Sequence, residues 1–258
     1  MAYYLCRMPD FLLIFLISFL AGMLGSLLGI GGGVLIAPGL IIFAHLPVRT
    51  AVGTSLLGVT ATSVTAAGIY IKRKMTDLKL ALIMETTTIP GAALSAFLAA
   101  RVPSRSISAI LGFVLLYVAI NMLKKSPAAS DESTPENRKN IIPAVLASFS
   151  AGFLSGLVGI GGGVLKTPIL HFIVGLPFKE AAATSVFMVG LTSSTGAVHY
   201  MARGDVNYAV AAVVILGVIG GAYAGTRIIK RAAPPHLKKI FSLVLVLMAI
   251  KLFLEVLK

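Results

Sequence analysis

Long apolar stretches separated by short basic connections run along most of the chain. The first of them, Phe11–Ala44, spans 34 residues and is interrupted only by a glycine cluster and by Pro38. One helix of that length would be about 50 Å long, whereas the hydrocarbon core of a bilayer is about 30 Å thick. The pattern therefore predicts two short helices, arranged either as a re-entrant hairpin or as two thin crossings.

The remaining apolar runs have the length of single membrane helices, and basic or proline-containing connections separate them. In the first half of the chain we expect helices over 51–71, 78–100 and 106–123. In the second half, the run 141–174 is again long enough for a broken pair, and helices over 181–201, 206–229 and 240–257 follow it. The polar segment 124–140 predicts a flexible linker between the halves, and residues 1–10 form a short polar tail.

The glycine cluster occurs twice. Gly29-Ile30-Gly31-Gly32-Gly33 returns as Gly159-Ile160-Gly161-Gly162-Gly163, 130 positions later, and aligning 21–70 with 151–200 without a gap gives 24 identities in 50 positions. The chain is therefore a duplicated unit, with repeat 1 over 11–123 and repeat 2 over 141–258. The apolar run that begins at Phe11 has its end repeated in mid-chain, which favours a structural element over a cleaved signal peptide.

Composition places the protein in a membrane. The chain is 57% hydrophobic and 12% charged, with a mean hydropathy of +0.97, whereas about a quarter of the residues are charged in a soluble domain. We expect an all-α polytopic protein whose surroundings are the lipid bilayer of the cell inner (plasma) membrane. The net charge is +13, and the basic residues lie mainly in the connections between apolar runs. This placement indicates that they orient the chain in the membrane and do not bind nucleic acid.

The basic residues also bear on topology. If each broken pair returns to its starting side, the two repeats are inverted, and one side collects thirteen connecting basic residues against six; a single crossing would give parallel repeats and eleven against eight. The stronger asymmetry favours inverted repeats, with the linker 124–140 and the loops 71–79 and 230–239 in the cytoplasm. The thirteen are Lys72, Arg73, Lys74, Lys79, Lys124, Lys125, Arg138, Lys139, Lys179, Lys230, Arg231, Lys238 and Lys239, and the six are Arg7, Arg49, Arg101, Arg105, Arg203 and Lys258.

The two glycine breaks are the first candidate site. Non-helical backbone at membrane depth is tolerated only where protein buries it or where it lines a watery cavity. Glycine lets successive amide N–H groups face one concavity, and the helix that follows adds the positive end of its dipole. We therefore expect the breaks to meet near the midplane and bind a small anion, although glycines that merely allow tight helix packing are the alternative. The residues are Gly31, Gly32, Gly33, Gly161, Gly162 and Gly163.

Lys166 follows the second break, where the first repeat has Ile36. A lysine at membrane depth costs about 2.5–3.5 kcal/mol, which indicates either a contact with the anion or a side chain that reaches for the surface. As the only formal charge beside the breaks, it is expected to be replaceable by isoleucine without loss of folding but with a strong loss of transport. Glu85, which has no counterpart in the second repeat, is a candidate for a coupled proton or for an ion pair with a nearby basic loop.

Hydroxyl residues follow the breaks on the next helix of each repeat. Thr54, Gly58, Thr62 and Thr65 lie on one helical face, as do Thr184, Thr192, Thr195 and His199. Such a stripe can line a pathway for a polar solute, or it can serve hydrogen bonds between helices. The hydroxyl residues chosen as candidates for substrate binding are Thr54, Ser55, Thr62, Thr184, Ser185, Thr192 and Ser193.

Enzymatic functions receive little support. The chain has no nucleotide-binding GxxxxGK[ST] motif and no GxSxG elbow, and its one cysteine and four scattered histidines give no metal spacing, so no cofactor is expected. A serine facing His199 would be needed for an intramembrane protease, and Ser193, Ser194 and Thr195 are candidates by proximity alone.

The doubled glycine segment, each copy followed by a proline (Pro38 and Pro168) and by a Thr-Ser pair, resembles the TauE/SafE family of sulfite exporters, also called the toluene sulfonate uptake permease family. The resemblance covers both halves of the chain. It implies a transporter of sulfite, a sulfonate or a related organosulfur anion. We expect a secondary transporter that exports this anion. An anion channel is the alternative of another class, and association of several copies of the chain is left open.

Overall fold

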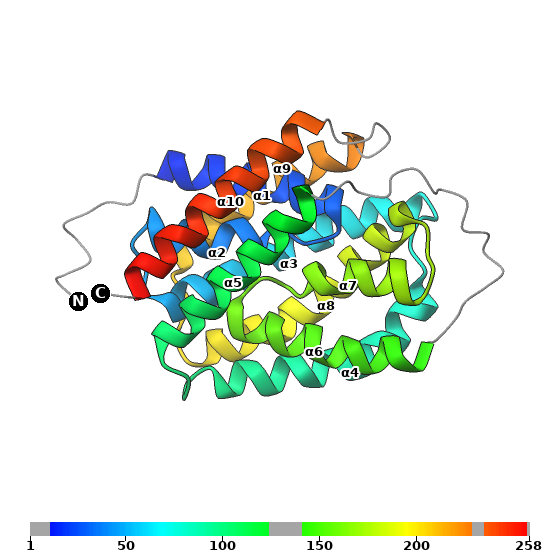
Figure 1. Ribbon diagram of the computed structural model, residues 1–258, viewed down its shortest axis with the longest axis horizontal. Helices are drawn as coiled ribbons and strands as arrows, with labels where there is room; N and C mark the ends of the chain where they lie inside the picture. The colour runs from blue at the N-terminus through cyan, green and yellow to red at the C-terminus, as the bar shows by residue number, and fades with distance from the viewer. Residues whose placement is uncertain (1–10, 124–140, 229–234, 257–258) are drawn as a thin grey trace.

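The computed structural model describes residues 11–123, 141–228 and 235–256, and every regular element in these ranges is helical (Figure 1). The tail 1–10, the linker 124–140 and part of the loop 230–239 lie outside the described residues. The first repeat contains α1 (Phe11–Leu28), α2 (Gly33–Ile42), α3 (Val48–Lys72), α4 (Leu78–Leu98) and α5 (Ser104–Leu123). The second contains α6 (Ile141–Val158), α7 (Gly163–Pro168), the π-helix η2 (Ile169–Ile173), α8 (Phe178–Ala202), α9 (Tyr208–Ile228) and α10 (Pro235–Val256).

The helices repeat with the same offset as the sequence. Adding 130 to the bounds of α1, α3 and α4 gives the bounds of α6, α8 and α9. Equivalent residues also lie at the starts of these helices. Pro47 and Pro177 precede α3 and α8, and Asp77 and Asn207 each accept a hydrogen bond from the amide three residues later, at 3.0 and 3.1 Å. Side-chain capping of this kind satisfies amides that the first helical turn leaves unpaired.

Each long apolar run is a helical hairpin around its glycine break. A Cβ on Gly32 would lie 2.6 Å from the Ala21 carbonyl oxygen, and one on Gly39 would lie 3.1 Å from Ile17 Cγ2. Residue numbers thus rise along α2 as they fall along α1, so α2 folds back against α1. Ten residues of helix span about 15 Å, half of a hydrocarbon core, which favours the re-entrant arrangement over a second crossing.

The two repeats are interleaved. Helix α1 packs along α9 and α6 packs along α4, in both cases between different repeats and with glycines at the contact. A Cβ on Gly22 of α1 would lie 2.5 Å from the Val218 carbonyl oxygen, and a Cβ on Gly91 of α4 would lie 2.5 Å from the Phe149 carbonyl oxygen. Small residues let backbones approach this closely in membrane helix pairs, where lipid provides no hydrophobic drive for association.

Helices α3 and α8 cross at the centre in opposite directions. Thr60 Oγ1 lies 3.0 Å from Ser193 Oγ, while Gly53 is packed on Tyr200 at the other end of the contact. Thr60 and Ser193 are equivalent to Gly190 and Ser63, which also meet, since a Cβ on Gly190 would lie 3.2 Å from Ser63 Cβ. These two contacts place a pseudo-two-fold axis between the two helices, perpendicular to both. Hydrogen bonds obey the same symmetry: Tyr70 donates to the Ser26 carbonyl at 2.9 Å and Tyr200 to the Gly156 carbonyl at 3.1 Å.

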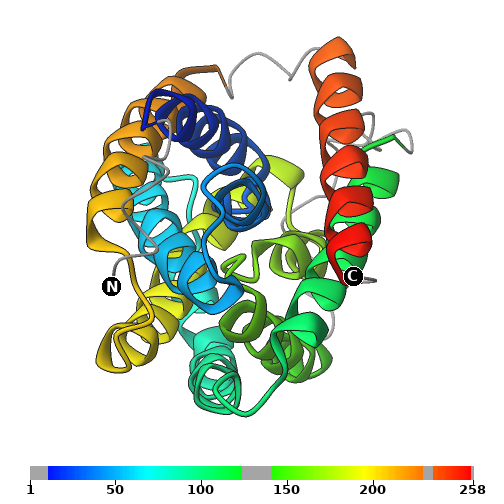
Figure 2. The same cartoon turned by 90° about the vertical axis from the view of Figure 1, so that its left-hand side faces the viewer.

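Helices α5 and α10 form a separate layer along one side of the molecule, as Figure 2 shows in green and red. They are antiparallel, because Phe113 stacks edge-on against Phe253 while Ser242 donates to the Ala119 carbonyl at 2.8 Å. The outer face of this layer is apolar, with Phe113 and Leu254 both largely exposed. Seven helices in the described ranges are long and apolar enough to cross a bilayer, and the protein is a multi-pass membrane protein.

Candidate functional site

The two glycine breaks meet at the pseudo-two-fold axis. A Cβ on Gly33 would lie 2.6 Å from Ile160 Cα, and one on Gly163 would lie 2.7 Å from Ile30 Cα. Backbone of one break therefore rests directly on backbone of the other. Only residues without a side chain permit this approach, and both breaks are almost wholly buried.

The conformation of each break also depends on glycine. The φ angles are 75°, 80° and 85° at Gly29, Gly31 and Gly32, and the equivalent residues Gly159, Gly161 and Gly162 have 78°, 79° and 75°. Other L-residues rarely adopt this left-handed region, in which the side chain crowds the backbone. The glycines thus serve tight packing and an unusual chain path at once, so the packing alternative describes only part of their role.

The breaks end at helix starts without side-chain caps. Gly32 and Gly162 are the N-cap residues of α2 and α7, and neither has a side chain that could accept from the first turn. The first amide N–H groups of a helix have no partner within it and carry the positive end of its dipole. Two such helix starts therefore approach one another in the protein interior.

The carbonyl groups of the breaks are bonded by the predicted hydroxyl helices. Ser55 Oγ on α3 donates to the Gly159 carbonyl at 2.9 Å, and Ser185 Oγ on α8 donates to the Gly29 carbonyl at 2.7 Å. Each serine thus holds the break of the other repeat. Thr167 adds a second bond to the Gly29 carbonyl at 3.2 Å, where the first repeat has Ala37.

Side chains from α3 and α8 cover the inner turns of the breaks. A Cβ on Gly31 would lie within 3 Å of both Val59 Cγ1 and Val189 Cγ1, and one on Gly161 would meet the same two atoms. Ser63 Oγ faces the same place, 3.8 Å from that Cβ position on Gly31. Ser63 is 1% exposed, and within the described residues its hydroxyl has no hydrogen-bond partner. Sequence reasoning missed Ser63, although the repeated Thr-Ser pairs Thr62-Ser63 and Thr192-Ser193 signalled it.

Lys166 is fully buried and paired with Glu85. Its Nζ lies 2.7 Å from Glu85 Oε1 and also contacts Thr192 Oγ1. The side chain does not reach for a membrane surface, and Glu85 pairs with this lysine instead of with a basic loop. The expectation that Lys166 is the only charge beside the breaks is therefore wrong, because a carboxylate from the first repeat lies against it.

The other predicted hydroxyl residues form hydrogen bonds away from the breaks. Thr54 and Thr184 accept from the amides of Asn207 and Asp77, at 3.1 and 3.0 Å, and so anchor the starts of α9 and α4. Thr62 donates within its own helix, to the Gly58 carbonyl at 2.9 Å. Of the seven hydroxyl candidates, the two serines Ser55 and Ser185 are thus the ones that bond directly to a break.

The histidine and hydroxyls considered for a protease are not arranged as a catalytic pair. His199 Nδ1 lies 2.9 Å from the Thr195 carbonyl oxygen. Ser193 Oγ donates to the Val189 carbonyl at 2.6 Å, and Ser194 Oγ donates to the Leu191 carbonyl at 2.8 Å. In the described part of the chain, no hydroxyl is hydrogen-bonded to His199, as a nucleophile and its base would require.

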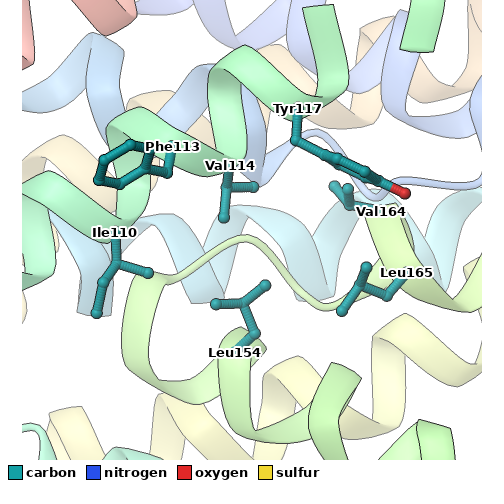
Figure 3. Close-up of a pocket in the computed structure, with 7 residues that line it drawn as sticks. All are labelled: Ile110, Phe113, Val114, Tyr117, Leu154, Val164 and Leu165. Carbon is teal, nitrogen blue, oxygen red and sulfur yellow. The ribbon is translucent and has the colours of Figure 1, made fainter. Parts of the chain in front are cut away.

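A cavity of about 300 Å³ opens beside the second break, between α5, α6 and α7 (Figure 3). Four of its residues recur along one face of α5, and two belong to the first turn of α7. Its lining is apolar, so it offers an anion no compensation for lost hydration. The lining residues are Ile110, Phe113, Val114, Tyr117, Leu154, Val164 and Leu165.

Comparison with known proteins gives the same family over most of the chain. A model of the family "Sulfite exporter TauE/SafE" matches residues 14–252. The chain belongs to the TauE/SafE family. The probable membrane transporter protein YunE of Bacillus subtilis is 30% identical over 270 residues, which cover 95% of this chain and 98% of YunE. The probable membrane transporter protein MJ0441 of Methanocaldococcus jannaschii is 32% identical over 257 residues, covering 94% and 95%.

No solved structure matches the chain significantly. The family and its relatives identify this TauE/SafE protein as a membrane transporter and not an enzyme.

Proposed function

We propose that this transporter moves a small sulfur-containing anion, such as sulfite or a sulfonate, out of the cell across the inner membrane. The observation that carries the proposal is the meeting of two uncapped helix starts at the pseudo-two-fold axis. Amide groups and dipole ends directed at one place favour an anion without requiring a full positive charge. The buried hydroxyl of Ser63, which has no partner among the described residues, adds a donor facing the same place.

The proposed route lies between the two repeats. Helices α3 and α8 bear Ser55 and Ser185, which bond to the breaks, and their crossing is where the repeats meet. In this conformation Val59 and Val189 close the space against the breaks. Movement of one repeat against the other around a fixed site would open it to each side in turn, as in other transporters built from repeats.

Proteoliposomes loaded with single anions test this function. We expect saturable flux of at least one of sulfite, thiosulfate, methanesulfonate and toluenesulfonate, with little flux of chloride or acetate. Ser63→Ala should raise the half-saturating concentration about tenfold or more, because it removes a donor worth about 1.5–3 kcal/mol to a charged partner. Ser148→Ala on α6, whose hydroxyl bonds within its own helix, is the matched control and should leave flux unchanged.

Current recordings separate this transporter from the anion channel. Single-channel currents would contradict a carrier, and the same glycine breaks would then line a pore. Absence of flux for all the sulfur anions would contradict the proposed substrate class.

We also propose that the two repeats are inverted in the membrane, with the linker 124–140 in the cytoplasm. Support comes from the opposite directions of α3 and α8, because two equivalent membrane-spanning helices that run in opposite directions must have opposite orientations. The charge asymmetry agrees, since α3 ends at the basic residues Lys72, Arg73 and Lys74.

Cysteine labelling of intact cells tests the orientation. In a Cys6→Ser background, Lys79→Cys should resist a membrane-impermeant reagent, whereas Ser104→Cys should react with it. Both positions are exposed, so accessibility within the protein is matched. Equal labelling of the two positions from outside would contradict the inverted arrangement.

A further inference from the structure

Three side chains from three helices form one buried polar cluster. Lys166 of α7 is 0% exposed and Glu85 of α4 is 2% exposed, and their charged atoms are 2.7 Å apart. Thr192 of α8 lies against both, with Oγ1 at 2.9 Å from Glu85 Oε2 and in contact with Lys166 Nζ. Around them lie apolar side chains, among them the fully buried Met84, Leu170 and Met188.

The fold does not require this cluster. The pseudo-two-fold axis relates this cluster to a second place, where the positions equivalent to Lys166, Glu85 and Thr192 hold Ile36, Ile215 and Thr62. The equivalent helices pack there without an ion pair. Burying two charges in an apolar interior is often no more stabilising than apolar residues of similar size, because the charges lose their hydration. Packing therefore gives no reason for the pair of Lys166 and Glu85.

The lysine has hydrogen-bonding capacity to spare. An ammonium group carries three N–H donors, and the described residues supply acceptors for two of them, Glu85 and Thr192. The hydroxyl of Thr192 has one proton, while Glu85 and the Met188 carbonyl oxygen both lie within bonding distance of it. Lys166 thus has one N–H donor left for a further acceptor.

We propose that Glu85 takes up a proton when an anion binds at Lys166, so that the transported anion and a proton bind together. This inference rests on the proposed anion transport. A carboxylate and an anion compete for one ammonium group in a poorly hydrated interior, where an unbalanced charge is costly. The exchange balances: the ion pair, one proton from solution and a monovalent anion give an ammonium–anion pair and a neutral Glu85 carboxylic acid. Thr192 stays bonded to the protonated carboxyl group.

Among the described residues, Lys166 is the titratable group that is bonded to Glu85. Its own helix also carries Lys79, and α6, which packs along α4, has no ionisable side chain. On α8 the ionisable residues are Lys179, Glu180, His199 and Tyr200, and η2 carries His171, whose Nδ1 lies 2.8 Å from the Leu176 carbonyl oxygen. Lys166 is the charged partner that this inference requires.

Calorimetry in buffers of different ionisation enthalpy counts the protons taken up on binding. The probe is methanesulfonate, or toluenesulfonate if the flux panel favours it, since each is a monovalent anion that stays ionised over the pH range of folding. We expect about one proton per bound anion at a pH where Glu85 is charged. The apparent affinity for the anion should then fall about tenfold for each unit by which the pH is raised, as uptake of one proton requires.

Two variants distinguish linkage from a structural ion pair. Glu85→Gln keeps the hydrogen bonds but not the charge, and it should bind the anion without proton uptake and with a flat pH profile. If this variant does not fold, Glu85→Ile with Lys166→Ile places at both positions the residue found at the equivalent position of the other repeat, and it should lose both anion affinity and proton uptake. Anion binding by wild-type protein without proton uptake, or a variant with unchanged pH dependence, would overturn the linkage. Failure of every sulfur anion to bind would instead contradict the proposed function.

Discussion

Replacing Lys166 with isoleucine will lower the free energy of unfolding by about 3–5 kcal/mol, because it leaves the Glu85 carboxylate buried without its partner. The sequence pattern alone gave the opposite expectation, that an intramembrane lysine is costly and that its removal would be tolerated. The carboxylate supplied by α4 reverses that result. For a chain of this size the loss corresponds to a lower unfolding temperature by roughly 10 °C, measurable by thermal denaturation in detergent.

The matched control removes both charges. Glu85→Ile with Lys166→Ile recreates the isoleucines that the chain holds at the equivalent positions 215 and 36. Replacing a buried ion pair with apolar residues is often neutral or stabilising, so the double variant should unfold near the wild-type temperature. Transport should be lost in both variants, which separates the role in transport from the role in stability. A single variant as stable as the double variant would mean that Glu85 does not depend on Lys166.

Replacing Gly221 with alanine will destabilise the protein by about 1–3 kcal/mol or more, because a Cβ there would overlap the Phe19 carbonyl oxygen of α1. The colliding atom belongs to a helix backbone and cannot turn aside as a flexible side chain can. Helices α1 and α9 would have to separate, and α1 carries the first glycine break at its end. Transport should therefore fall together with the unfolding temperature.

Gly68 on α3 is the control for this substitution. A Cβ there meets nothing within 4 Å, and its backbone is helical. Gly68→Ala should leave stability unchanged or raise it by about 0.5–1 kcal/mol, because alanine loses less conformational freedom in a helix. Equal effects of the two substitutions would show that the seam between α1 and α9 is not closely packed in the membrane.

The positions of the helices and the duplication could be predicted from the sequence without knowledge of any tertiary contact. The observed helices start or end within a few residues of the predicted runs in most cases, since apolar length and proline or basic boundaries are properties of the chain itself. The largest differences are at helix starts: α10 starts at Pro235 and not at 240, and α3 and α8 start at Val48 and Phe178 and not at 51 and 181. In each, the helix starts at or beside a proline, where the missing N–H costs nothing. The π-helix η2 was not expected, because its hydrogen-bond pattern leaves no clear mark in the sequence.

The sequence by itself determined that this is a duplicated all-helical membrane transporter of the TauE/SafE family, with two glycine breaks at equivalent places. Length, apolarity and an offset of 130 residues carry that information without reference to any contact. The tertiary structure decided which groups meet. It placed the two breaks backbone to backbone, bonded Ser55 and Ser185 to the break of the opposite repeat, and paired Lys166 with Glu85 across 81 positions. These contacts arise between helices far apart in the chain, and burial makes each decisive, because a polar group deprived of water is stabilised only by the partner that the fold supplies.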